Sequence, residues 1–216
     1  MNRQFRAYNA LASDLLEYPA DSPQALAAAM RSSLPAGGDA DYGAINSALL
    51  LLADTIHNLS LEELRREHVA MFDLRPEYCL YMAWHIYGDS PQQGRALAAL
   101  TEIYKDAGYP LNGKQLPDYL PLMLEFISVA PAWACSVLTQ GFMGQIKILA
   151  GKISAAQSVY APLGNALAAL AEINAQAVNH DAPAECRQAP NTPGALFPEV
   201  GTRPAHGSFT RLTEYL

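Results

Sequence analysis

The sequence predicts an all-α protein: a single globular domain of about eight to ten helices with an irregular C-terminal tail. Apolar residues recur at three- and four-residue steps through most of the chain, which is the spacing of one helix face. Half of the 216 residues are apolar and only 16% are charged, as in globular proteins with a buried core. This length can form one core without division into two domains. We therefore expect a helical domain over residues 1–176 and a Pro/Gly-rich tail over residues 177–216.

The N-terminal part of the chain is expected to form four helices, over residues 5–18, 22–34, 44–57 and 60–73. Pro19 ends the first, because proline cannot continue a helix. Ser22-Pro23 places an N-cap and a first-position proline at the start of the second. Pro35 to Asp41 is expected to be a loop. Ser60 and Glu63 have the spacing of a capping box, in which each side chain bonds the other residue's amide.

Five further helices are expected, over residues 78–87, 91–107, 117–127, 132–150 and 153–174. The first of these is rich in aromatic residues, which also suits a strand, but nothing nearby could pair with a lone strand. Ser90 and Gln93 suggest a second capping box, and Gly108 a glycine C-cap. Pro162 is expected to kink the last helix.

Charge and composition exclude several classes of protein. The formal charge of −7 and the pI near 5.1 argue against a nucleic-acid partner, which would require a basic surface. Three widely separated cysteines indicate reduced thiols in a cytosolic compartment. Two uncharged stretches, 126–146 and 153–171, contain proline, glycine and amides, so we expect buried helices rather than membrane spans. No signal peptide is recognisable, and we expect a cytoplasmic protein without stable membrane insertion.

Enzymatic chemistry has no positive support in the sequence. The chain lacks a glycine-rich phosphate loop and a nucleophile-elbow motif, and its histidines do not have metal-ligand spacing. Asp118 and Glu125 are seven residues apart, and we expect them to share one helix face, where solvated or ion-paired carboxylates are the commoner outcome. We therefore expect no catalytic residue, no metal and no cofactor.

The aromatic residues of the 78–87 segment are spaced for binding as well as for packing. Tyr78, Tyr81, Trp84 and Tyr87 recur every third residue, near one face of the expected helix. Core packing and a groove for a partner helix both explain this spacing. Acidic residues bracket the aromatic ones in consecutive elements. An apolar groove with an acidic rim would suit a peptide that carries both basic and hydrophobic side chains.

An ordered set of motifs in this part of the chain resembles the NarJ-type chaperones, the nitrate reductase delta subunit assembly proteins related to the TorD/DmsD maturation family. The motifs are Phe72-Asp73-Leu74, Gly88-Asp89-Ser90, Gly94, Leu97-Ala98-Ala99-Leu100, Tyr104, Gly108, Leu116-Pro117-Asp118-Tyr119-Leu120-Pro121 and Leu124-Glu125-Phe126. The resemblance implies a TorD-like helical chaperone that binds the N-terminal segment of a molybdoenzyme catalytic subunit, most simply that of respiratory nitrate reductase. Such a chaperone assists molybdenum cofactor insertion before membrane docking.

The resemblance implies a set of peptide-binding residues: Phe72, Asp73, Tyr81, Trp84, His85, Asp89, Pro117, Asp118, Tyr119 and Glu125. At two positions the chain departs from the family pattern, with Gln93 before Gly94 and Tyr119 where histidine is common. Several alternatives remain open. The client could be a related molybdenum dehydrogenase, and the protein a monomer or a domain-swapped dimer. A small helical hydrolase, a ligand-binding protein or a structural subunit would also fit.

Overall fold

The computed structural model describes residues 3–34, 42–113 and 115–181, so both the tail beyond residue 181 and the loop predicted at 35–41 lie outside the described residues. Within those ranges the chain forms nine α-helices and no strand, which confirms the all-α class. The helices are α1 (Arg3–Leu16), α2 (Pro23–Ser33), α3 (Gly43–His57), α4 (Leu61–His68), α5 (Met82–Tyr87), α6 (Pro91–Asp106), α7 (Leu120–Val129), α8 (Ala132–Ala155) and α9 (Ala161–Asp181). No described helix combines the length and apolarity that crossing a membrane requires.

The caps predicted for the N-terminal helices are present. The Ser22 hydroxyl accepts a hydrogen bond from the Ala25 amide at 3.2 Å and opens α2. At α4, the Glu63 amide donates to the Ser60 hydroxyl, while the Glu63 carboxylate accepts from the Ser60 amide at 2.8 Å. Each of these caps involves only residues within one helical turn, so the local sequence is sufficient to predict it.

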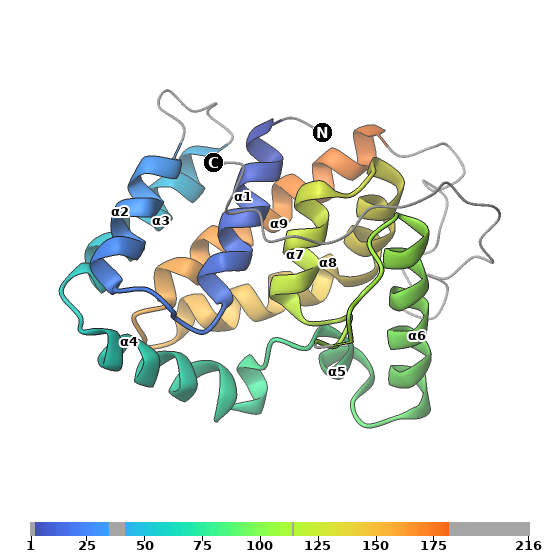
Figure 1. Ribbon diagram of the computed structural model, residues 1–216, viewed down its shortest axis with the longest axis horizontal. Helices are drawn as coiled ribbons and strands as arrows, with labels where there is room; N and C mark the ends of the chain where they lie inside the picture. Colours follow the sequence, from blue (N-terminus) through green and yellow to red (C-terminus); the bar gives the residue numbers. More distant parts are fainter. Residues whose placement is uncertain (1–2, 35–41, 114, 182–216) are drawn as a thin grey trace.

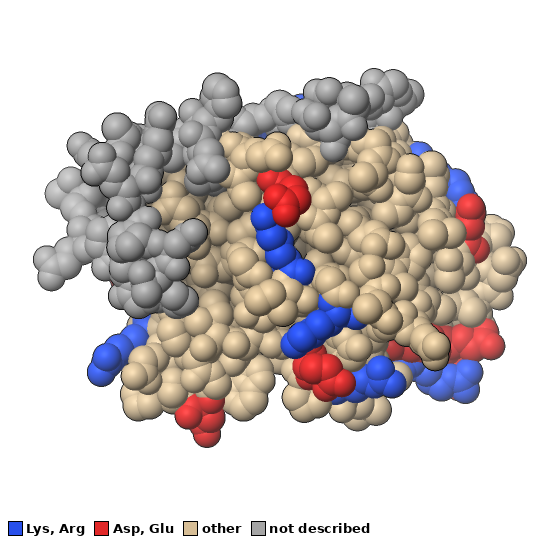
Figure 2. Space-filling model, turned by 180° about the vertical axis from the view of Figure 1, so that it is seen from behind, with Lys and Arg blue, Asp and Glu red and all other residues tan. Residues whose placement is uncertain are grey.

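The core lies around the long helices α8 and α9, which make the most extensive helix–helix contact (Figure 1). Gly164 of α9 allows their close approach, since a Cβ there would lie 2.3 Å from the Ser154 backbone nitrogen of α8. Helices α1 and α7 pack against each other, and α3 packs on α9. From behind, charged side chains are sparse over the middle of the molecule (Figure 2). An ion pair of 2.8 Å between Lys147 and Glu172 joins α8 to α9.

A reciprocal amide pair ties the first helix to the last described one. Asn9 and Asn174, 165 positions apart and both buried, each donate to the other's side-chain oxygen, at 3.1 and 2.9 Å. Asn9 also donates to the Phe5 carbonyl at 2.9 Å. Buried amides without partners are costly, so this pair stabilises one alignment of α1 on α9.

The predicted kink in the last helix is wrong. Pro162 is the second residue of α9, where a missing amide hydrogen costs nothing because first-turn amides have no partner within the helix. The break falls at residues 156–160, a few residues later than predicted. Helix α9 also continues to Asp181 rather than ending near residue 174.

The segment predicted as one helix over residues 78–87 has a different structure. A 3-10 turn (Pro76–Tyr78) comes first, Leu80 lies in a bend, Tyr81 is extended, and only Met82–Tyr87 form α5. Tyr81 forms an isolated antiparallel bridge with Tyr119, so the assumption that no pairing partner exists was wrong. The Met82 amide donates to the Asp118 carbonyl at 3.0 Å, and the Leu120 amide donates to the Leu80 carbonyl at 2.7 Å. We call this pairing the bridge.

The bridge also corrects the start of the following helix. Residues 117–119 belong to a turn and to the bridge, so α7 begins at Leu120 rather than at Pro117. Asp118 and Glu125 are therefore not on one helix, and the shared face predicted for them is absent. Backbone groups at 118 and 120 bond across to residues 80 and 82, and Tyr119 between them is extended.

Helix α6 begins at Pro91 as predicted and has the predicted glycine C-cap, but its predicted N-terminal capping box is absent. The Ser90 side chain makes no capping hydrogen bond, so the second capping box is absent. At the other end, Gly108 has a φ of 90°, a left-handed conformation that favours glycine. The Gly108 amide donates to the Lys105 carbonyl and the Tyr109 amide to the Tyr104 carbonyl, the two bonds of a Schellman C-cap.

Candidate functional site

A π-helical turn, η2 (Val69–Asp73), continues α4 and leads to the region of the predicted binding residues. In a π-helical turn the hydrogen bond spans one residue more than in an α-helix. Here it runs from the Leu74 amide to the Val69 carbonyl at 3.1 Å. Such turns are rare and are frequent at functional sites. The turn buries Phe72 and leaves Asp73 exposed, and the next residue, Leu74, is 71% exposed. An apolar side chain and a carboxylate are thus presented to solvent side by side.

Asp118 lies at the centre of the bridge and is fully buried. Its Oδ2 accepts a hydrogen bond from the Ala83 amide at 2.9 Å, so the carboxylate caps α5 from 35 positions away. Its Oδ1 has no hydrogen-bond partner among the described residues. Burial raises the pKa of Asp118, while the hydrogen bonds from backbone amides and the charge of His85 act to lower it. This carboxylate holds α5 in place from inside the molecule.

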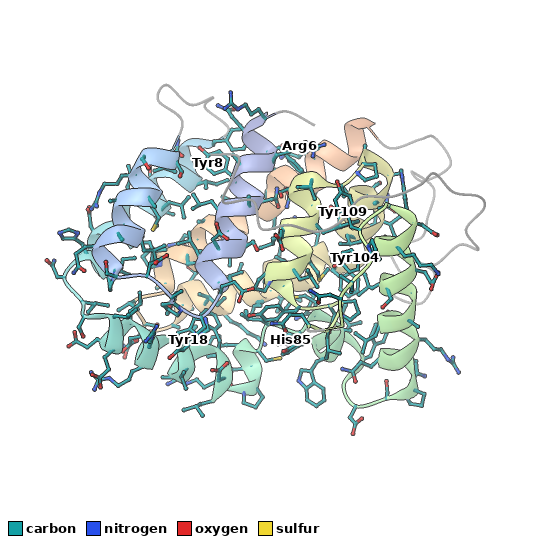
Figure 3. The ribbon with its side chains drawn as sticks, in the orientation of Figure 1. Arg6, Tyr8, Tyr18, His85, Tyr104 and Tyr109 are labelled. Carbon is teal, nitrogen blue, oxygen red and sulfur yellow. The ribbon has the colours of Figure 1, made fainter. Side chains whose placement is uncertain are left out.

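The bridge is supported from α6 as well. The Tyr104 hydroxyl, which is completely buried, donates to the Pro117 carbonyl at 2.8 Å. Figure 3 shows Tyr104 between α6 and α7, where its ring also packs edge-on against Phe126 at 4.4 Å. Burial raises the pKa of Tyr104 well above its ordinary value, and the charges of Asp118 and Glu125 act in the same direction. This hydrogen bond holds the backbone at the buried Pro117, next to Asp118 and Tyr119.

Two tyrosines of the bridge form a half-buried ring pair beside two carboxylates. The Tyr81 and Tyr119 ring centroids are 5.3 Å apart. Burial raises the pKa of both phenols, and the charges of Glu17 and Asp73 raise both further. Tyr119 also donates a hydrogen bond to Glu17, at the end of α1, which again favours its neutral form. We call Glu17, Asp73, Tyr81 and Tyr119 the acidic tyrosine cluster.

The short segments around the bridge also expose large apolar side chains to solvent. Leu74 comes directly after Asp73, and Trp84, 41% exposed, lies three residues after Tyr81. Leu116 is 48% exposed, and its carbonyl accepts from the Tyr119 amide at 3.2 Å. A single exposed leucine needs no explanation, but three large apolar residues exposed within a few positions of Asp73, Tyr81 and Tyr119 in the sequence suit a binding surface.

His85 contributes to the shape of this region. It is part of α5 and lies on the lower side of the molecule in the view of Figure 3. Its Nε2 is 2.8 Å from the Cys79 carbonyl oxygen and 3.5 Å from the Cys79 sulfur. Burial raises the pKa of Cys79, which favours the thiol over the thiolate. Among the described residues no three His, Cys, Asp or Glu side chains are grouped to hold a metal ion.

The remaining predicted residues are distributed around this region. Phe72 packs its ring against His68 at 5.0 Å and Tyr160 at 5.1 Å, and so belongs to the core. Asp89 is exposed after Gly88, which has a φ of 58°. Glu125 is half-buried on α7. The structure thus brings Asp73, Tyr81 and Tyr119 together, and whether each predicted residue binds peptide remains a prediction.

Comparison with known proteins gives consistent matches to one family. Residues 35–134 match the nitrate reductase delta subunit family. Over 128 residues the chain is 31% identical to the probable nitrate reductase molybdenum cofactor assembly chaperone NarJ of Bacillus subtilis, covering 59% of this chain and 70% of the relative. The chain belongs to the nitrate reductase delta subunit family. This confirms the resemblance that the sequence motifs indicated.

Two relatives from Escherichia coli K12 match over shorter stretches. The probable molybdenum cofactor assembly chaperone NarW is 36% identical over 84 residues, covering 38% of this chain and 36% of the relative. The assembly chaperone NarJ is 29% identical over 105 residues, covering 49% and 44%. The aligned part therefore spans less than half of either E. coli protein. These relatives are named as assembly chaperones and not as enzymes, in agreement with the prediction that the chain is not an enzyme.

Three residues near the bridge, Glu17, Leu74 and Leu116, were not among the binding residues predicted from the sequence. The matched residues 35–134 include α5, α6, α7 and the bridge, but not α1. Glu17 lies outside that range and was not among the predicted residues. No local pattern identifies it, because it joins the cluster only when the end of α1 comes beside Tyr119. Leu74 and Leu116 stand within quoted family motifs, and their exposure could not be known from spacing alone.

Proposed function

We propose that this chain is a NarJ-type chaperone that assists molybdenum cofactor assembly of a nitrate reductase by binding the N-terminal segment of its catalytic subunit. The observation that carries the proposal is membership of the nitrate reductase delta subunit family. The chaperone acts in the cytoplasm, before the catalytic subunit docks at the membrane. It takes part in assembly without being a subunit of the finished enzyme.

The surface beside the bridge supports this proposal chemically. An amphipathic segment would lay its apolar side chains on Leu74, Trp84 and Leu116, all of which are exposed. Large apolar side chains supply the contact area, and a tryptophan is a frequent anchor in interfaces. Carboxylates beside these residues would meet basic side chains, which helps encounter and orientation more than it raises affinity.

Binding of this kind must be reversible, because the client has to leave the chaperone after cofactor insertion. A Kd between about 1 μM and 1 nM would combine specific holding with release. While held, the segment is unable to make premature contacts at the membrane. On this proposal the chaperone domain, predicted to end at residue 176, extends to the end of α9 at Asp181.

The proposal is tested by calorimetric titration with a peptide from the N-terminus of a nitrate reductase catalytic subunit. A scrambled peptide of equal charge is the control, and an N-terminal peptide from a related molybdenum dehydrogenase tests the choice of client. Selective binding of the nitrate reductase peptide with a negative heat-capacity change is expected, because apolar surface is buried. Equal binding of native and scrambled peptides would contradict the proposal.

A further inference from the structure

Tyr104 is a buried tyrosine whose hydroxyl bonds to the backbone of another segment. It lies near the end of α6, completely buried, and its hydroxyl donates to the Pro117 carbonyl at 2.8 Å. Its ring packs edge-on against Phe126 of α7 at 4.4 Å. A phenylalanine would keep this ring contact, but the Pro117 carbonyl would lose the phenolic donor, and buried polar groups without partners are costly. The hydroxyl therefore acts on the segment that contains Pro117.

Pro117 is one link in a closed series of contacts around α5. The next residue, Asp118, accepts the Met82 amide on its carbonyl at 3.0 Å and the Ala83 amide on its Oδ2 at 2.9 Å. Helix α5 packs against α6, and residues 88–90 connect the two helices. Because α6 carries Tyr104, the series returns to its starting point. Breaking any one of these links would therefore loosen α5.

Helix α5 depends on these contacts more than the longer helices do. It has six residues, and so short a helix is not stable by itself in water. The Met82 and Ala83 amides, which Asp118 accepts, belong to its first turn. Trp84, 41% exposed, follows directly. The direction in which this tryptophan points is therefore set by the contacts that hold the start of α5.

The bridge places Trp84 close to a second exposed apolar residue. Tyr81 pairs with Tyr119 in antiparallel orientation. Trp84 comes three positions after Tyr81, and Leu116, 48% exposed, comes three positions before Tyr119. In an antiparallel pair these two directions leave the bridge at the same end. Both residues therefore depend on the backbone that Tyr104 contacts.

We propose that Tyr104 is a positioning residue of the client-binding surface: through Pro117 and Asp118, its hydroxyl fixes the place of α5 and hence the way in which Trp84 meets the client. The inference rests on the proposed chaperone function and adds to it a residue that does not touch the client. A preformed anchor loses less conformational freedom on binding. Loss of the hydroxyl should therefore weaken binding, although every exposed side chain is kept.

Tyr109 provides a matched control in the same part of the molecule. Its hydroxyl also donates to a backbone carbonyl, that of Val129 at 3.3 Å, and its ring also packs edge-on against Phe126, at 5.8 Å. Both tyrosines are labelled in Figure 3, close to α7. Val129 is the last residue of α7, whereas Pro117 precedes its first. The same substitution therefore removes a hydroxyl at either end of α7, and only one of the two ends adjoins the bridge.

The test compares Tyr104→Phe with Tyr109→Phe in the full chain. Calorimetry measures the Kd of the nitrate reductase N-terminal peptide, and hydrogen exchange without peptide measures the protection of the Met82 and Ala83 amides. Both substitutions are also combined with Asp118→Ala, which shows whether either acts through that residue. Because phenylalanine keeps each ring, both variants are expected to fold, and urea denaturation checks this.

Tyr104→Phe is expected to weaken peptide binding about fivefold, the usual effect of one lost buried hydrogen bond. Exchange at the Met82 and Ala83 amides should accelerate more than exchange in α8. Tyr109→Phe should keep the Kd within about twofold of the wild type and leave these two amides unchanged. In the Asp118→Ala background, Tyr104→Phe should have little further effect on the Kd, because the link to α5 is already broken.

Three results would overturn the inference while leaving peptide binding in place. They are a wild-type Kd in Tyr104→Phe, equal losses in the two tyrosine variants, and losses that add fully when Tyr104→Phe is combined with Asp118→Ala. Unchanged exchange at the Met82 and Ala83 amides would also overturn it, since the hydroxyl would then not hold α5. Absence of peptide binding by the wild type would instead contradict the proposed function itself.

Discussion

The helical core around α8 and α9 and the bridge region around α5 are built by different means. In the core, side chains at helical spacing fill the space between long helices, and the N-terminal helices α2 and α4 are capped by residues within one turn. In the bridge region, short segments are held by hydrogen bonds from residues far away in sequence, such as Asp118 to the Ala83 amide, 35 positions apart. The exposed apolar and acidic side chains adjoin the second region. The difference shows that the core provides stability and the bridge provides the shape of the surface.

The largest effect is expected in the core, at the contact of α8 with α9. In Gly164→Ala the new Cβ would lie 2.3 Å from the Ser154 nitrogen and 2.7 Å from the Ala150 oxygen, both backbone atoms that cannot move aside alone. We expect a loss of about 3 kcal/mol or more in the free energy of unfolding, measured by urea denaturation. Gly144→Ala on α8 is the control, because no atom beyond the adjoining backbone of its own helix lies within 4 Å of its Cβ position.

The control should respond in the opposite direction. Alanine is favoured over glycine in a helix interior by about 0.5–1 kcal/mol, so Gly144→Ala is expected to be neutral or stabilising. Equal losses in the two variants would mean that helix propensity, and not the close approach of α8 and α9, determines the response.

A smaller and more local effect is expected at the bridge. Asp118→Ala removes the acceptor of the Ala83 amide, and we expect a loss of about 1–2 kcal/mol, as for other helix caps. Hydrogen exchange at the Ala83 amide should accelerate more than exchange in α8, because α5 opens without unfolding of the core. Asp89→Ala, at an exposed position near the same helices, should change stability by less than about 0.5 kcal/mol. Uniform acceleration throughout the chain would show that the two regions unfold together.

The smallest effect is expected at the junction of the two regions, where His68 lies between α4 and the π-helical turn. The ring is buried among Tyr18, Phe72 and Tyr160, and burial lowers its pKa below 6.5, although the Leu16 carbonyl and the charge of Asp73 act in the opposite direction. The unfolded chain therefore binds a proton more readily than the folded one. Stability from the neutral ring is complete above pH 6.5 and is lost as the pH falls toward the lowered pKa.

His68→Gln should reduce this loss of stability on acidification, since glutamine has no charge to gain. The free energy of unfolding of the wild type and the variant, measured between pH 7.5 and about 5, gives the comparison. Identical slopes for the wild type and His68→Gln would show that the buried ring does not contribute to the pH dependence.

The success of sequence prediction follows the same division between core and bridge. Caps such as Ser60 with Glu63 depend on residues within one turn, and the sequence predicted them correctly. The bridge depends on a pairing between distant segments, and without knowledge of that pairing Tyr81 was assigned to a helix. Pro162 was interpreted as a kink, because sequence alone did not locate the break before α9. Glu17 was missed for the same reason as the bridge: its partners are close only in the folded chain.

The reciprocal pair of Asn9 and Asn174 bears on whether the protein exchanges segments between copies. The two amides satisfy each other only when α1 and α9 are aligned in one way, so a shift of either helix along the other would break both bonds together. Nothing in this requirement depends on the two helices belonging to the same chain. The same pair would form if α1 of one molecule packed on α9 of another. The amide pair therefore fixes how α1 aligns with α9. It would preserve the same packing in a monomer and in a dimer that had exchanged α1.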